Sequence, residues 1–238
     1  MRFLPLVLFA ISTACTPVVV QTAQPPSALQ AASPTPPPRV SQRRAVDNFE
    51  FVVNRLEPVA EQYCRARNQQ VNCDFQIVVD DRPGGGVNAF QTLDRNGRPI
   101  IGFTIPLIAE ARNRDELALV MAHEAAHHIR GHIARQQQNA ALGGFLGGTL
   151  AGALGATDIS AIETAQRFGA TVGARSYSKE FELEADALGA RIAAAAGFDP
   201  LRGAGFFLRI PDPGNRFLGT HPPNAERLRT VQRVAAGL

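Results

Sequence analysis

One short stretch of this chain, Ala122 to His132, limits what the chain can fold into more than any other. It holds the pattern His123-Glu124-x-x-His127 within a run whose apolar residues recur at helical spacing. Acidic residues precede the run, where negative charge stabilises a helix N-terminus, and Gly131 follows it, as is typical of a helix end. We therefore expect a helix in which the two histidines lie one turn apart on the same face.

Two imidazoles on one face of a helix can bind a single metal ion. Zn²⁺ binds imidazole nitrogen and, in catalytic sites, keeps one coordination position for water. Glu124 stands next to His123, where it can take a proton from that water and pass it to a leaving amine. The alternative is a chance spacing on a solvated helix. Against it, four of the five histidines lie within ten residues, and the apolar flank predicts burial, where unpaired imidazoles are costly.

A helix with this pattern supplies only two ligands, so a third must come from elsewhere in the chain. The segment from Tyr177 to Gly197 predicts a second helix, which carries Glu182 and Asp186 four residues apart on one face. With Glu182 as the third ligand, Asp186 lies one turn along and can accept a hydrogen bond from the outer nitrogen of a ligating histidine. A solvated acidic face is the alternative, and it fits Glu180 and Glu184 better.

The first 45 residues are expected to lie outside the folded domain. Residues 1–14 combine a basic residue, a short apolar run and small residues, as in an export signal that is too short to span a membrane. The small residues lead into Cys15, which indicates a bacterial lipoprotein signal with lipid on the cysteine sulfur. The alternative is ordinary cleavage after Ala14, which leaves a free cysteine. Residues 15–45, rich in proline, predict a semi-extended tether.

Residues 46–238 have the length and composition of one globular domain. The hydrophobic fraction of the chain, 45%, is ordinary, and the formal charge of +3 comes from scattered arginines, which argues against nucleic-acid binding. Cys64 and Cys73 are the two cysteines left in an exported chain, so a disulfide between them is the natural assignment. Metal binding by this pair is the alternative, but no histidine lies nearby in the sequence.

Three short segments rich in β-branched and aromatic residues predict strands ahead of the histidine helix, at 75–79, 87–91 and 99–103. We expect them to form a small antiparallel sheet. If the segment 87–91 is an edge strand over the metal, it can hold a peptide by pairing with it as an additional strand. The residues that would bind substrate in this way are Val87, Asn88, Ala89 and Phe90. A purely structural hairpin is the alternative.

Two further segments predict helices. Residues 46–66 carry apolar residues on one side, and Pro58 can kink this helix or divide it. Residues 140–156 are rich in glycine and alanine and carry no charge. They fit a small-residue helix packed closely on its neighbours, a mobile lid over the cleft, or a segment that touches a membrane, in that order of preference.

Four motifs follow one another along the chain. They are the Val87-Asn88-Ala89-Phe90 segment, His123-Glu124-x-x-His127 followed by His132, Glu182-x-x-x-Asp186, and Thr220-His221-Pro222-Pro223 followed by Glu226-Arg227. Over residues 46–238 this series resembles the M48 family of zinc metalloproteases. The resemblance implies an α+β fold of the gluzincin type, mainly helical with a small antiparallel sheet. It also implies that His123, His127 and Glu182 bind zinc and that Glu124 is the general base.

The resemblance gives a role to the fifth histidine as well. In the family, the histidine at the position of His221 faces the metal, where it stabilises the tetrahedral oxyanion or occupies the open position as a switch. Capping of the helix that Pro222 and Pro223 begin is the alternative. We interpret His128 and His132 as structural, because neither shares the face of the metal pair as closely.

These observations predict an exported bacterial zinc metalloendopeptidase with one Zn²⁺ per chain. We expect a minimal protease domain in the periplasm, held to the outer membrane by a lipid on Cys15. By resemblance, its substrates are unfolded or misassembled envelope proteins, and its role is protein quality control. The alternative is a periplasmic chaperone or binding module that keeps a latent metal site and cleaves little. No nucleic-acid partner is expected.

Overall fold

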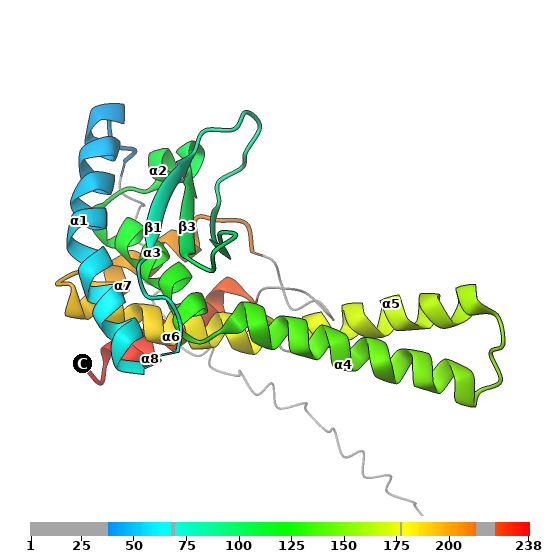
Figure 1. Ribbon diagram of the computed structural model, residues 1–238. Coiled ribbons are helices and arrows are strands. Elements are labelled where there is room, and N and C mark those ends of the chain that lie inside the picture. Colours follow the sequence, from blue (N-terminus) through cyan, green and yellow to red (C-terminus); the bar gives the residue numbers. More distant parts are fainter. Residues whose placement is uncertain (1–37, 68–69, 177, 213–221) are drawn as a thin grey trace, which may run out of the picture. The chain divides into compact units, whose positions relative to one another are not determined.

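The computed structural model describes residues 38–67, 70–176, 178–212 and 222–238, which belong to one compact unit. The expected export signal, the lipidated Cys15 and most of the tether lie outside the described residues, as does His221. The elements, most of which are labelled in Figure 1, are α1 (Gln42–Arg67), β1 (Gln76–Asp80), β2 (Ala89–Leu93), β3 (Pro99–Thr104), α2 (Ile105–Glu110), α3 (Arg114–Ile129), α4 (His132–Ala153), α5 (Ile159–Ser176), α6 (Ser178–Ala195), α7 (Pro200–Gly203), the 3-10 helix η1 (Ala204–Leu208) and α8 (Asn224–Ala235).

Helix α3, which carries the histidine pattern, is the central element of the fold. It packs against α1, α6 and α7 and against two strands of the sheet. Most of its residues are buried, since neighbours cover nearly every side of it. Its first turn is fixed by Asn113, whose side chain accepts a hydrogen bond from the backbone N–H of Glu116. Helix α3 ends at Ile129, and Gly131, in the left-handed conformation, leads into α4.

The three expected strands form one sheet, but the sheet is mixed rather than antiparallel. The strand order is β1-β3-β2, with β2 antiparallel and β1 parallel to β3. The prediction of an antiparallel sheet assumed that strands adjacent in sequence pair with each other. Instead β3, the most buried strand, takes the centre, and the glycine-rich connection over residues 81–88 carries the chain past it. Because β3 lies between them, β1 and β2 both become edge strands in the described part of the chain.

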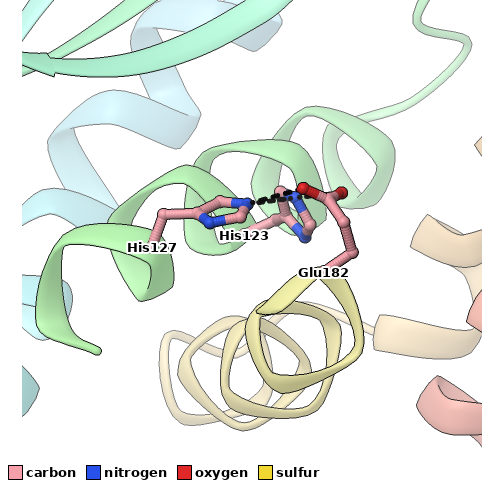
Figure 2. Close-up of side chains that lie close together, drawn as sticks. All are labelled: His123, His127 and Glu182. Atoms are coloured by element: carbon pink, nitrogen blue, oxygen red, sulfur yellow. Dashed lines mark hydrogen bonds and ion pairs between the residues drawn. The ribbon is translucent and has the colours of Figure 1, made fainter. Parts of the chain in front are cut away.

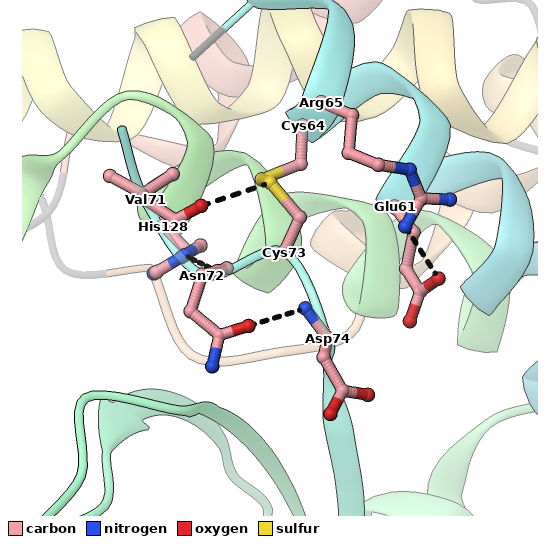
Figure 3. The surroundings of a disulfide bond; sticks show 8 residues. All are labelled: Glu61, Cys64, Arg65, Val71, Asn72, Cys73, Asp74 and His128. Atoms are coloured by element: carbon pink, nitrogen blue, oxygen red, sulfur yellow. Dashed lines mark hydrogen bonds and ion pairs between the residues drawn. A yellow bond between two sulfur atoms is a disulfide. The ribbon is translucent and has the colours of Figure 1, made fainter. Parts of the chain in front are cut away.

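The helix expected over residues 46–66 runs from Gln42 to Arg67 without a break at Pro58. Its C-terminal end is tied to the segment before β1 by a disulfide between Cys64 and Cys73, as the sequence predicts (Figure 3). Both cysteines are buried. In the same region, the buried His128 of α3 meets the backbone carbonyl oxygen of Asn72 through Nε2 at 2.7 Å. The disulfide therefore lies beside the C-terminal end of the central helix.

Helices α4 and α5 lie side by side as a hairpin and contact each other far more than they contact the rest of the unit (Figure 1). Glycines on both helices allow a close approach. A Cβ added at Gly143 would lie 2.2 Å from the carbonyl oxygen of Gly169, and one at Gly147 would lie 2.3 Å from that of Ala165. The segment 140–156 is thus a small-residue helix packed closely on its neighbour, the first of the three interpretations.

The surface of this hairpin carries many exposed apolar side chains. Seven large apolar side chains on it are more than half exposed: Leu142, Phe145, Leu146, Leu150, Leu154, Ile159 and Phe168. Even so, the helices of the described ranges include none with the length and apolar character needed to cross a membrane.

Substitution at Gly143 should open the hairpin. In Gly143→Ala, the new methyl group meets backbone rather than a side chain, so the two helices must separate, at a cost of about 1–3 kcal/mol. Gly152→Ala on the same helix is the matched control, because a Cβ there meets nothing within 4 Å. Hydrogen exchange of the amides of α4 and α5 measures the effect. Equal protection in the two variants would show that the close contact does not hold the hairpin together.

Candidate metal centre

Two helices bring together three side chains that could hold a metal ion. His123 and His127 extend from one face of α3, and Glu182 extends towards them from α6 (Figure 2). The Nε2 atoms of the two histidines lie 3.0 Å apart. Oε2 of Glu182 is 3.5 Å from Nε2 of His123, and Oε1 is 3.3 Å from Nε2 of His127.

These separations have the dimensions of a zinc site. Zinc–nitrogen and zinc–oxygen distances near 2.0–2.2 Å place two ligand atoms of a tetrahedron about 3.3–3.6 Å apart. The three ligand pairs measured here are 3.0, 3.3 and 3.5 Å apart. Two imidazoles and one carboxylate form a donor set of catalytic zinc sites, in which a fourth position stays open. The residues therefore fit Zn²⁺ in both chemistry and spacing.

The outer nitrogen of His123 is held by a buried carboxylate. Oδ1 of Asp186 lies 2.9 Å from Nδ1 of His123, in the position expected from the spacing of Glu182 and Asp186. Arg227 of α8 donates to both oxygens of the same carboxylate, at 2.8 and 2.7 Å. Burial alone would raise the pKa of Asp186, but the charge and hydrogen bonds of Arg227 hold it below its usual range. Asp186 thus remains an anionic acceptor, which fixes the ring of His123.

His127 has a different partner on its outer side. Its Nδ1 lies 2.8 Å from Nδ1 of His132, the first residue of α4. Nε2 of His132 lies 3.2 Å from Oε2 of Glu184, which Arg135 holds with a donated bond of 2.8 Å. Burial, together with the neighbouring His127, lowers the pKa of His132 to about 4, so its ring is neutral at pH 7.

A close contact between the two helices sets the distance from Glu182 to the histidines. Gly189 lies on the same face of α6 as Glu182, two turns further along. A Cβ added at Gly189 would come within 2.9 Å of the backbone nitrogen of His123. No larger residue fits this position without separating α6 from α3. Because Gly189 has no side chain, α6 lies close enough to α3 for the carboxylate of Glu182 to reach His123 and His127.

The metal point opens into a cavity of about 540 Å³. Glu124 lines it together with the three ligands, as does the edge of the sheet from Val87 to Gln91. Strand β2 begins at Ala89, so Val87 and Asn88 precede it, but all four residues expected to bind substrate line the cavity. Apolar residues from η1 and the segment after it, Phe206, Phe207, Ile210 and Pro211, also line the cavity. The cavity is thus lined by the three candidate metal ligands, by the carboxylate of Glu124 and by the edge of the sheet at β2.

Sequence reasoning missed some of these residues. Arg227 was noticed only as part of a motif and was given no role. His132 was interpreted as structural because it lies five residues beyond His127, off the face of the metal pair. A turn at Gly131 brings it back towards that face, and no helical periodicity predicts this. Arg227 stands six residues after His221, and this spacing alone does not indicate that it pairs with Asp186 of α6.

Comparison of the sequence with known proteins identifies a family and several relatives. The sequence profile described as peptidase family M48 matches residues 52–235. The beta-barrel assembly-enhancing protease of Escherichia coli O157:H7 is 34% identical over 141 residues, which cover 52% of this chain and 28% of that protein. The protein of the same name from Yersinia pestis is 33% identical over 179 residues, which cover 68% of this chain and 34% of that protein. The match thus spans about a third or less of these relatives.

Metal affinity should depend on pH through His123. Burial favours its neutral ring, but the hydrogen bond and charge of Asp186, with the contact to Glu182, outweigh burial and raise the pKa of His123 to about 10. A proton and a zinc ion compete for Nε2, and the raised pKa keeps the proton bound at neutral pH. Apparent zinc affinity should therefore rise with pH, by up to about tenfold per pH unit for each proton displaced.

Competition with a chelator at pH 6, 7 and 8 measures this dependence. Asp186→Asn removes the charge that raises the pKa, so its dependence should be shallower. A zinc affinity of the wild-type protein that does not change over this range would contradict the prediction.

Proposed function

The chain belongs to peptidase family M48, and on that basis we propose that it is a zinc metalloendopeptidase that hydrolyses peptide bonds in bacterial envelope proteins. The observation that carries the proposal is the convergence of His123, His127 and Glu182 at zinc spacing, with Glu124 lining the same cavity. One zinc ion per chain is expected at this point.

When bound, zinc polarises the scissile carbonyl and lowers the pKa of a coordinated water towards about 7. The two histidines and Glu182 would hold the ion. Glu124 follows His123 directly on α3 and lines the same cavity. It takes a proton from the attacking water and gives it to the nitrogen of the leaving amine as the peptide bond breaks. His221, which lies outside the described residues, is proposed to stabilise the oxyanion or to close the open position.

Strand β2 supplies a way to hold the substrate. It pairs with β3 on one side, and within the described ranges no strand pairs with its other side. An extended peptide can add to this edge through backbone hydrogen bonds, which recognise an unfolded chain without regard to its sequence. The residues proposed to bind substrate, Val87 to Phe90, lie where such a peptide would pass into the cavity. An unfolded or misassembled protein is the substrate class that fits this mode of binding.

The proposed location is the bacterial periplasm, with a lipid on Cys15 as anchor to the outer membrane. The Cys64–Cys73 disulfide supports export, because disulfides persist in oxidising compartments. The relatives are named for enhancing β-barrel assembly. We extend from that name the proposal that this chain acts in quality control of envelope proteins.

Glu124→Gln tests the mechanism. The amide keeps the size of the side chain but cannot take a proton, so zinc content should stay at one per chain while casein cleavage falls by at least about 100-fold. Glu180→Gln is the control, since that carboxylate is exposed on α6. Both quantities are measured on each purified protein. One zinc without cleavage in the wild type would favour the latent-site chaperone, and full activity of Glu124→Gln would refute the mechanism.

Cys15→Ser tests the anchor. Without the thiol no lipid can be attached, so the variant should incorporate no labelled palmitate and should move from the membrane fraction to the soluble periplasmic fraction. The double variant Cys64→Ser/Cys73→Ser is the control, because it keeps Cys15. A Cys15→Ser variant that still sediments with the outer membrane would rule out lipidation as the anchor.

A further inference from the structure

We propose that His132 is a positioning residue for the metal centre, which fixes the tautomer and ring orientation of His127 through an imidazole–imidazole hydrogen bond. This inference rests on the proposed zinc site. It assigns a function to a histidine that lies off the metal-binding face of its neighbours and that the spacing of the sequence marked as structural.

The direction of the hydrogen bond follows from the geometry. Nε2 of His127 faces His123 and Glu182, so its lone pair points to the metal and its proton must sit on Nδ1. That Nδ1 lies 2.8 Å from Nδ1 of His132, which therefore accepts. A neutral His132 then carries its own proton on Nε2, which faces Oε2 of Glu184 at 3.2 Å. Every donor in this series meets an acceptor when His127 presents its Nε2 lone pair to the metal.

The ring of His132 is itself held in place. It is 4% exposed and stacks on the ring of Phe181, with centroids 4.7 Å apart and planes 9° from parallel. Arg135 lies over the same phenylalanine, 4.2 Å from its centroid, and donates to both oxygens of Glu184. The acceptor that His127 meets is thus fixed by packing on one side and by a charged pair on the other. A ring so constrained can hold a second ring in one orientation.

The two ligating histidines consequently have unlike partners. His123 is held by the carboxylate of Asp186, which also accepts from Arg227. His127 is held by the imidazole of His132, with the carboxylate of Glu184 one residue further away. Outer partners of this kind typically change metal affinity or activity by about 10–100-fold when they are removed. Loss of His132 should fall in that range even though no ligand is changed.

Two substitutions separate positioning from packing. His132→Phe keeps a ring to stack on Phe181 but removes the acceptor. His132→Asn loses the stacked ring but keeps an acceptor, because its side-chain oxygen is as many bonds from the backbone as Nδ1 of histidine. A positioning role predicts that zinc affinity is lower in His132→Phe than in His132→Asn. A packing role predicts the reverse: zinc affinity and thermal stability are then higher in His132→Phe, which keeps a stacked ring, than in His132→Asn, which loses it.

The experiment is a chelator competition for Zn²⁺ on the full chain, with Co²⁺ absorption spectra of each variant and thermal unfolding of each protein. We expect affinity to fall about 10–100-fold in His132→Phe, with an altered Co²⁺ spectrum, and to recover most of that loss in His132→Asn. His128→Phe is the control, because that buried histidine of α3 contacts the backbone of Asn72 instead of a ligand. It should keep the wild-type affinity and spectrum.

The possible results distinguish this inference from the proposed function. Wild-type protein that binds no zinc stoichiometrically would refute the metal site itself. Wild-type protein that binds one zinc, with unchanged affinity and Co²⁺ spectrum in folded His132→Phe, would refute only the positioning role. If His132→Phe does not fold, Glu184→Gln supplies the test, since it weakens the acceptor beyond His132 and should lower zinc affinity by a smaller factor.

Discussion

The close contact between α3 and α6 determines the geometry of the candidate metal centre. One helix carries two imidazoles and the other carries a carboxylate, and neither forms a site alone. The helices can approach closely because Gly189 has no side chain where it meets the backbone of His123. The same contact buries Asp186 completely, at 0% exposure, so that its charge requires a partner. Arg227 supplies that partner and thereby fixes α8 against α6.

The metal centre is also connected to parts of the chain that lie further away. Through His132 and Arg135, the first turn of α4 contacts the outer side of His127 and Glu184. Helix α4 continues into the hairpin with α5, which carries many exposed apolar side chains. The residues from Val87 to Gln91, at the edge of the sheet, line the same cavity. The candidate site is thus contacted both by a sheet edge and by the first turn of α4.

Much of this arrangement could be predicted from the residues. The helical spacing of His123 and His127, and of Glu182 and Asp186, places each pair on one face, and the structure brings both faces together. The small sheet, the mainly helical α+β fold and the Cys64–Cys73 disulfide were also predicted. The prediction of a purely antiparallel sheet was wrong. Strand β1 pairs parallel with β3 rather than with β2, its neighbour in sequence, and order along the chain does not reveal this.

By itself, then, the sequence determined the local periodicities: which residues share a helix face, where acceptors follow ligands by one turn, and which family the chain belongs to. Only the tertiary structure decided which faces meet and how closely. His132 meets Glu184 and Arg227 meets Asp186, both on α6 and distant in sequence. His127 is only five residues from His132, but the two rings meet through the turn at Gly131, and α6 reaches α3 through the close approach at Gly189. Contacts of this kind arise from packing between elements, and local spacing along one helix carries no information about them.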